Sequence, residues 1–332
     1  MRLQFMEETI SVKWNNLLDL CTKQTLAQMF RFQDIPPDGD PSSRIQEFQE
    51  VLPRLLCCRY WWMAEWRSQQ MSFPYWRLYW NRSGKAKVVY NKTIYLEPHR
   101  LILIPPNTPF ATDIEGSAMD QSQPYSLKGG RVESREMEEK MIGDGTVLHM
   151  FIHFTLGYPF DTISPEIFLF EATKDQKQLI HSITEQLIHG RVKFNQPGSL
   201  ELYSLLFSLL HQIPVDAWRN RILDSRVIRG ILHMEENIKE IEIANRTLAE
   251  IGGMSVNAYA RIFKEQTGYS PRKYLQKMRV EKACNLLHHS DLSIDQIAST
   301  CGFSDRYYFT RIFTRTMNIS PGVYRKNGVL IN

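Results

Sequence analysis

A short pattern of residues occurs twice in the last third of the chain. The matched pairs are Gly253 and Gly302, Arg261 and Arg311, Phe263 and Phe313, Ser270 and Ser320, Pro271 and Pro321, and Tyr274 and Tyr324. The offset is 49 residues at the glycines and 50 from the arginines onward, so the second copy holds one inserted residue. The chain must therefore build one local structure twice.

Each copy begins with the signature of a short helix. Thr247 with Glu250, and Ser293 with Gln296, have the spacing of a capping box, in which two side chains satisfy free amides at a helix start. Each copy then reaches its glycine about a turn and a half later, where a chain leaving a helix needs positive φ.

A second helix follows each glycine. Ser255 and Ser304 stand two residues after the glycines and just before a new helical pattern, as N-cap residues do. The sequence therefore predicts helix, short turn and helix in each copy, which is a motif that reads DNA.

The second helices each have an apolar face and a polar face. The residues predicted to face the core are Tyr259, Ile262, Phe263, Tyr308, Phe309, Ile312 and Phe313. The residues predicted to contact DNA are Asn257, Ala260, Arg261, Lys264, Arg306, Tyr307, Thr310 and Arg311. Arginine can bond a guanine edge with two donors and asparagine an adenine edge, while a small residue allows close approach. A structural ion pair is the alternative for Arg261 and Arg311.

The Ser-Pro pair at 270–271 predicts a third kind of element, because proline is well tolerated at the first position of a helix. From there an apolar pattern continues to about His289. A helix of 19 residues is about 28 Å long, and one turn of DNA is about 34 Å. Such a helix could hold two reading units in successive major-groove segments on one face of a duplex.

At these residues the chain resembles the arabinose-regulator (AraC/XylS) family of bacterial transcription factors. Its DNA-binding domain has two helix-turn-helix units joined by a long helix. The matching residues are Leu248, Ala249, Gly253, Ser255, Arg261, Phe263, Gly268, Ser270, Pro271, Tyr274, Arg279, Ala283, Leu286, Leu287, Ile297, Ala298, Gly302, Phe303, Tyr308, Phe309, Arg311, Phe313, Ser320, Pro321, Tyr324 and Arg325. The chain departs from the family at Ala258 and Tyr259, where an aromatic residue followed by leucine is usual. It also departs at Asn318, which replaces the glycine that the first copy has at Gly268.

The charge distribution agrees with a nucleic-acid partner for the C-terminal part. Residues 221–332 hold 17 Lys or Arg against 11 Asp or Glu, a net of +6, and the preceding residues hold 23 against 25, a net of −2. The basic excess lies where the repeat lies, as expected for a surface that binds phosphate.

The cysteines and the apolar runs exclude several classes of protein. The five cysteines, Cys21, Cys57, Cys58, Cys284 and Cys301, are odd in number and lack CxxC spacing, so they suggest neither a disulfide framework nor a zinc site. No apolar run approaches 18 residues. We therefore expect a reduced, cytoplasmic protein with no membrane partner.

The N-terminal half changes from helical to strand composition. Residues 6–32 predict one or two helices, and the Pro-rich stretch 34–43 predicts a loop. Aromatic and β-branched residues between 59 and 104, with turn signals at 73–74 and 81–84, predict short strands of an antiparallel sandwich or barrel. Residues 113–146 lack strand periodicity and predict a long surface loop or lid.

Two amphipathic helices are predicted after the strands, over 175–190 and 199–213. The leucines of the second helix are expected either to pack under the barrel or to form a dimer interface. Residues 213–220 read as a linker, and 225–241 as the leading helix of the DNA-binding part. The fold class is thus α+β, divided as 1–172 (sensing), 173–220 (helical dimerisation and linker) and 221–332 (DNA-binding).

The resemblance extends less specifically to the strands, which look like the cupin-type, jelly-roll sensing domain of many family members. It implies a small-molecule effector inside the barrel, for which a sugar is one candidate. The residues it suggests as contacts are Trp76, Arg77, Tyr79, His99 and His153, with core packing as the alternative for the aromatic ones. His149 and His153 share one strand face, but the full histidine and glutamate pattern of a cupin metal centre is absent, so we expect no metal or cofactor.

The sequence therefore favours a bacterial transcription regulator that binds double-stranded DNA, as a homodimer by family resemblance, and that contacts RNA polymerase if it is an activator. An enzyme on the barrel is the second hypothesis, but no metal-ligand triad, phosphate-binding glycine loop or nucleophile elbow is present. RNA binding is disfavoured, because the RNA major groove is too narrow for a helix.

Overall fold

The strands form where aromatic and β-branched residues are dense. A computed structural model describes residues 51–115, 125–157, 160–188, 193–218 and 223–329, so the predictions for 6–32 and 34–43 lie outside the described residues. The strands are β1 (Arg54–Met71), β2 (Trp76–Ser83), β3 (Ala86–Val89), β4 (Thr93–Tyr95), β5 (Arg100–Ile104), β6 (Phe110–Ile114), β7 (Tyr125–Arg131), β8 (Val147–Thr155) and β9 (Phe168–Glu171). The predicted strands between 59 and 104 are thus present.

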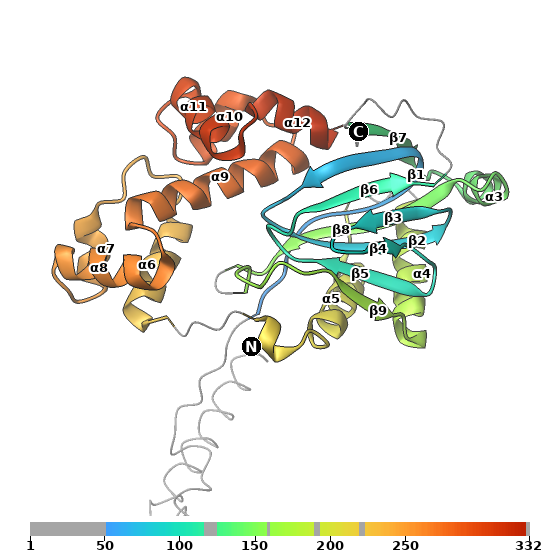
Figure 1. Cartoon of the computed structure of the whole chain (residues 1–332), viewed down its shortest axis with the longest axis horizontal. Coiled ribbons are helices and arrows are strands. Elements are labelled where there is room, and N and C mark those ends of the chain that lie inside the picture. The colour runs from blue at the N-terminus through green and yellow to red at the C-terminus, as the bar shows by residue number, and fades with distance from the viewer. Residues whose placement is uncertain (1–50, 116–124, 158–159, 189–192, 219–222, 330–332) are drawn as a thin grey trace, which may run out of the picture. The chain divides into compact units, whose positions relative to one another are not determined.

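These strands make one curled antiparallel sheet, which we call the half-barrel (Figure 1). The strand order is β4-β3-β6-β1-β8-β2-β5-β9, and β7 pairs with β1 off this path. The long strand β1 holds the sheet together, because its first part pairs with β8 and its later part with β6 and β7.

Alternation along the strands separates two apolar layers. On β8, Leu148, Met150 and Ile152 belong to an outer layer, while His149 and Phe151 point to the concave side. The outer layer is covered by α4 (Lys174–Ile188) and α5 (Gln196–Leu210). Six leucines were predicted to pack under the barrel or to form a dimer interface. Five of them are buried against the half-barrel, namely Leu202, Leu205, Leu206, Leu209 and Leu210, whereas Leu200 is 56% exposed.

The prediction of a surface loop over 113–146 is wrong for much of that segment. It contains β7 and a helix, α3 (Arg135–Gly143), capped by the Ser134 side chain. The helix is anchored by Glu138, which is 1% exposed, accepts a 2.7 Å hydrogen bond from Tyr60 Oη and pairs with Arg82. These long-range partners are not visible in local periodicity, and they compensate for a weakly apolar helix.

The C-terminal part is all helical. Its helices are α6 (Ser225–Glu236), α7 (Asn245–Ile251), α8 (Val256–Thr267), α9 (Pro271–His289), α10 (Ile294–Thr300), α11 (Arg306–Met317) and α12 (Pro321–Val329). Between the half-barrel and α6 lies a short 3₁₀ turn, η2 (Val215–Ala217). Contacts group Val51–Asn332 as one compact unit, so the three-part domain division stays a prediction.

The helix starts agree with the sequence in three of five places. Ser255 caps α8, Ser293 and Gln296 form the predicted capping box of α10, and α9 begins at Pro271. The Thr247 cap is wrong, because α7 already begins at Asn245, after Ala244.

The Ser304 cap is also wrong by one residue. Asp305 caps α11 by accepting a hydrogen bond from the Tyr308 amide, while Ser304 donates to the Asp305 carboxylate. The inserted residue of the second copy is thus taken up between Gly302 and α11, and the carboxylate is the better partner for free helix amides.

Helix α9 supplies side chains to the cores of both helix-turn-helix units. Leu275 packs in the upstream core with Tyr259 and Phe263, and Ala283 and Leu287 pack in the downstream core. Among the described residues, no helix is long and apolar enough to cross a membrane.

The turn glycines of the two units give a matched test of this packing. Both have positive φ, +62° at Gly253 and +72° at Gly302. A Cβ at Gly253 would meet nothing within 4 Å, but one at Gly302 would lie 2.3 Å from the Ile238 carbonyl oxygen. We expect Gly253→Ala to cost about 1–2 kcal/mol of unfolding free energy, and Gly302→Ala about 1–3 kcal/mol more. Urea unfolding of both variants measures this, and equal costs would contradict the close packing at Gly302.

Candidate DNA interface and ligand cavity

The upstream surface predicted to contact DNA is the exposed face of α8. Asn257, Arg261 and Lys264 are exposed and spaced four and three residues apart, so they lie on one helix face. Ala260, on the same side, is half-buried. The Arg261 side chain is 77% exposed, and its guanidinium is 4.0 Å from Glu265, so it is not committed to a structural ion pair.

The downstream surface is the corresponding face of α11. Arg306, Tyr307 and Arg311 are exposed, and Thr310 is half-buried among them. Tyr307 is 85% exposed, so its ring is accessible to a partner. Arg306 pairs with Asp295 of α10 at 3.2 Å, and the Arg311 guanidinium lies 5.4 Å from the centre of the Tyr308 ring.

The inward faces of both helices agree with the sequence prediction. Tyr259, Phe263, Phe309 and Phe313 are fully buried, and Ile312 is nearly so. This burial leaves the opposite, polar faces of α8 and α11 toward solvent.

A buried arginine links α9, the helix between the two helix-turn-helix units, to the upstream unit. Arg279 on α9 is 8% exposed and donates to the backbone carbonyl oxygens of Glu240 and Ile241, which follow α6. Charged donors to carbonyls make strong hydrogen bonds. Arg279 is one of the residues that match the family pattern, and in the structure it holds α9 against the segment that follows α6.

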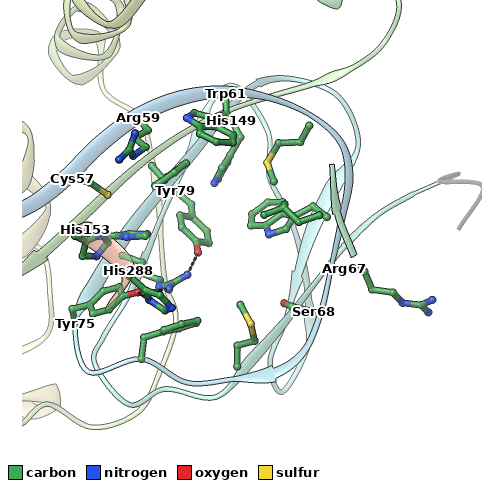
Figure 2. A pocket seen from close by; sticks show the side chains of 18 of the residues that line it. Cys57, Arg59, Trp61, Arg67, Ser68, Tyr75, Tyr79, His149, His153 and His288 are labelled. Atoms are coloured by element: carbon green, nitrogen blue, oxygen red, sulfur yellow. Dashed lines mark hydrogen bonds between the residues drawn. The ribbon is translucent and has the colours of Figure 1, made fainter. Parts of the chain in front are cut away.

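The second candidate site is a cavity on the concave side of the half-barrel (Figure 2). Its walls come from β1, β2, β7 and β8, and its remaining side comes from the C-terminal end of α9. The cavity volume is about 70 Å³, and the empty space around it, open solvent at the mouth included, is about 930 Å³. Aromatic and sulfur-containing side chains make the apolar walls, among them Trp61, Met63, Trp66, Phe73 and Phe151.

The cavity contains a buried cation, Arg77, which is 5% exposed. Its guanidinium donates to Tyr79 Oη at 2.7 Å and to Tyr75 Oη at 2.8 Å, and stacks on Phe73 with 3.5 Å to the ring centre. Its Nε has no hydrogen-bond partner. No ion pair to Arg77 is found among the described residues. Two tyrosine hydroxyls and an aromatic ring face, in place of a carboxylate, contact its charged group.

A hydrogen-bonded chain leads from this arginine to α9. Tyr75 Oη, which accepts from Arg77, lies 2.7 Å from Nδ1 of His288. Burial, together with the charge of Arg77, holds the pKa of His288 well below its usual range, so its ring is neutral and can accept from Tyr75. Arg77, Tyr75 and His288 thus form a continuous polar contact between the cavity and α9.

The cavity histidines of β8 are neutral as well. Burial lowers the pKa of His149 to about 3, and its Nδ1 donates to Oδ1 of Asn81 at 2.7 Å. Burial also holds the pKa of His153 well below its usual range, and neither of its ring nitrogens has a partner.

The structure brings together only some of the residues suggested for effector contact. Arg77, Tyr79 and His153 line the cavity. Trp76 lies in the outer layer, where its indole donates to Asp161 at 2.8 Å, and His99 is half-exposed near Glu97 and Glu171. We do not retain Trp76 and His99 as candidates for this cavity.

The contribution of α9 to the cavity was not predicted from the sequence. His288 and His289 stand at the end of the predicted helix, but no local pattern shows that they approach the half-barrel. Cys57 and Trp61 were not predicted either, although alternation along β1 places them on the same face as Arg59. Trp66 reaches this face only after the register shift between Met63 and Glu65.

Comparisons with known proteins concern mainly the C-terminal part. Residues 248–327 match a family described as a helix-turn-helix domain. The transcriptional activator RhaS of Enterobacter sp. (strain 638) is 32% identical over 127 residues, which cover 38% of this chain and 45% of RhaS. RhaS of Salmonella schwarzengrund (strain CVM19633) is 37% identical over 98 residues, covering 30% of this chain and 35% of that protein. The chain thus matches less than half the length of these relatives.

Among solved structures, a transcriptional regulator from Chromobacterium violaceum, described as containing an AraC-type DNA-binding domain, is 31% identical. The match covers 31% of this chain and 90% of the Chromobacterium violaceum chain, with a TM-score of 0.30. The matched segment contains α8, α9 and α11, which carry both reading faces and the helix between them. Residues 248–327 of this chain are therefore similar to the helix-turn-helix part of these transcription regulators.

Proposed function

We propose that the protein is a sequence-specific DNA-binding regulator of transcription, whose activity a small molecule in the half-barrel controls. The observation that carries this proposal is that α9 packs into both helix-turn-helix cores, with an exposed polar face on α8 and another on α11. At 19 residues, α9 is about 28 Å long. This length suits two reading helices in successive major-groove segments.

The residues proposed to contact DNA are those predicted from the sequence, Asn257, Ala260, Arg261, Lys264, Arg306, Tyr307, Thr310 and Arg311. Arg261 and Arg311 are the candidates for reading guanine edges, and Asn257 for reading adenine. The half-buried Ala260 and Thr310 allow the helices to lie close to the bases.

Replacing each arginine tests base reading. Arg261→Ala and Arg311→Ala should each weaken binding to a preferred site by about 1–3 kcal/mol and relax sequence preference at one position. Binding selections with randomised duplexes, followed by titration of the preferred site, measure both effects.

Arg100→Ala is the matched control, because it removes one positive charge from the half-barrel, where Arg100 pairs with Glu97 and Glu171. It should leave affinity and preference unchanged. If Arg261→Ala and Arg311→Ala weaken binding equally on every sequence, these arginines contact only phosphate, and the assignment of base reading fails.

For the effector, we propose an anionic small molecule with an apolar or aromatic body. A buried guanidinium without an anionic partner is costly to the fold, and residues that cost stability are often kept for function. Arg77 would bond the anion, and the tryptophans of β1 would contact the apolar body. A sugar, suggested by family resemblance, would need an acidic group to fit this site.

A mechanism follows from the hydrogen-bonded chain. An anion at Arg77 changes the partners of Tyr75 Oη, and Tyr75 bonds His288 on α9. An effector that binds one arrangement of half-barrel and α9 more tightly shifts the population toward it. The spacing or orientation of the two reading faces then changes DNA affinity.

A thermal-shift screen of small carboxylates, phosphates and neutral sugars tests the effector class. At a concentration of 100 times its Kd, an effector adds about 2.7 kcal/mol of stability. We expect stabilising compounds to be anionic, to lose their effect in Arg77→Met, and to keep it in Arg100→Met. Neutral compounds that stabilise wild type and Arg77→Met equally would contradict this proposal.

Two further parts of the proposal come from the family. We propose a homodimer, supported by Leu200 and Phe207, which remain exposed two turns apart on α5. If the protein is an activator, RNA polymerase is its partner in the cytoplasm. We propose no enzymatic activity, because the matched relatives are named as transcriptional activators.

A further inference from the structure

Three side chains capable of binding a metal ion meet where α9 reaches the half-barrel. They are Cys57 of β1, His153 of β8 and His289 of α9, and one ligand atom from each lies within 4.8 Å of the others. Figure 2 shows Cys57 and His153 on one side of the cavity, away from Arg67 and Ser68. The cluster therefore occupies the α9 side and leaves the tryptophan-lined side to an effector.

The sheet itself brings two of these residues together. Cys57 stands directly opposite His153 in the β1–β8 register, and a register irregularity between Leu55 and Cys57 precedes it. Irregularities of this kind redirect side chains and are frequent beside functional sites. His289 is the last residue of α9, and its ring centre lies 5.2 Å from that of His153.

The histidines of the cluster have unsatisfied nitrogens. Both ring nitrogens of His153, which is 3% exposed, lack a hydrogen-bond partner, as does Nε2 of His289. A buried nitrogen without a partner is costly. By contrast, the neighbouring His288 has both nitrogens occupied, by Tyr75 Oη and by the Tyr324 carbonyl oxygen.

We propose that Cys57, His153 and His289 bind one thiophilic metal ion, and that this ion is monovalent copper. Thiolate and imidazole are the ligands that copper and zinc prefer. Metal–nitrogen and metal–sulfur bonds of about 2.0–2.3 Å place the ligand atoms about 3.3–3.6 Å apart. Side-chain rotations that move the ligand atoms by about 1 Å would therefore bring them to bonding distance. Binding replaces the Cys57 thiol proton, which leaves to solvent.

The surrounding charge selects the ion. The guanidinium groups of Arg59 and Arg77 line the same cavity as the three ligands. A monovalent ion with one thiolate and two neutral imidazoles makes a neutral centre. A divalent ion would leave a net positive charge beside two guanidinium groups, and burial makes that charge costly.

An ion held by these three residues would tie α9 to β1 and β8. Because α9 also joins the two reading units, occupancy would couple to DNA binding, a consequence that rests on the proposed function. The metal site itself does not depend on it and is measured without DNA.

The test is an anaerobic titration of the reduced full-length protein with Cu(I), in competition with the chromophoric chelator bicinchoninate. We expect one equivalent of Cu(I) bound, with release of one proton and an X-ray absorption spectrum showing one sulfur and two nitrogen neighbours. Cys57→Ser and His289→Gln should each lower affinity by about 100-fold or more, since loss of second-shell partners alone costs 10–100-fold.

Cys58→Ser is the matched control, because Cys58 is adjacent in β1 but packs in the outer layer. It should bind Cu(I) as the wild type does. A parallel competition with Zn(II) should show weaker binding than Cu(I). The proposal is overturned if wild type and Cys57→Ser bind Cu(I) equally, if Cys58→Ser loses binding, or if Zn(II) binds more tightly.

Discussion

The shared packing of α9 is the constraint on which the C-terminal structure depends. One helix supplies Leu275 to the upstream core and Ala283 and Leu287 to the downstream core, so neither unit can shift along it without opening a core. Interiors are close-packed, and such movements are costly. Arg279 adds a polar clamp by binding the carbonyls after α6. The distance between the reading faces is thereby built into a single helix.

The same helix ends at the half-barrel, where the cavity holds an arginine without an acidic partner among the described residues. Tyr75 receives a hydrogen bond from this arginine and bonds His288, so the cavity and the spacing helix share a polar contact. Buried polar chains of this kind have few alternative arrangements that satisfy every group. A ligand that takes over a hydrogen bond of one residue in this chain must change the hydrogen bonds of the others. In this way a small molecule would change the arrangement of α9 and of the two helix-turn-helix units.

Local patterns predicted much of this architecture. The span of α9, the positive φ of Gly253 and Gly302, and the buried faces of α8 and α11 follow from capping, turn chemistry and periodicity. The errors came where partners distant in sequence decide the outcome. β7 exists because β1 is long enough to pair with it, and α3 is held by Glu138 and Tyr60. The cavity was predicted only in part, since periodicity cannot show that His288 and His289 meet β1 and β8.

The central claim is sequence-specific binding of DNA, and capture of genomic fragments tests it most directly. The purified full-length protein would be mixed with sheared genomic DNA at several salt concentrations, and the retained fragments sequenced. We expect binding to a few sites to survive near roughly 0.2 M salt, because base contacts add to the salt-sensitive phosphate contacts. Uniform loss of all fragments with rising salt, with no sequence enriched, would contradict it.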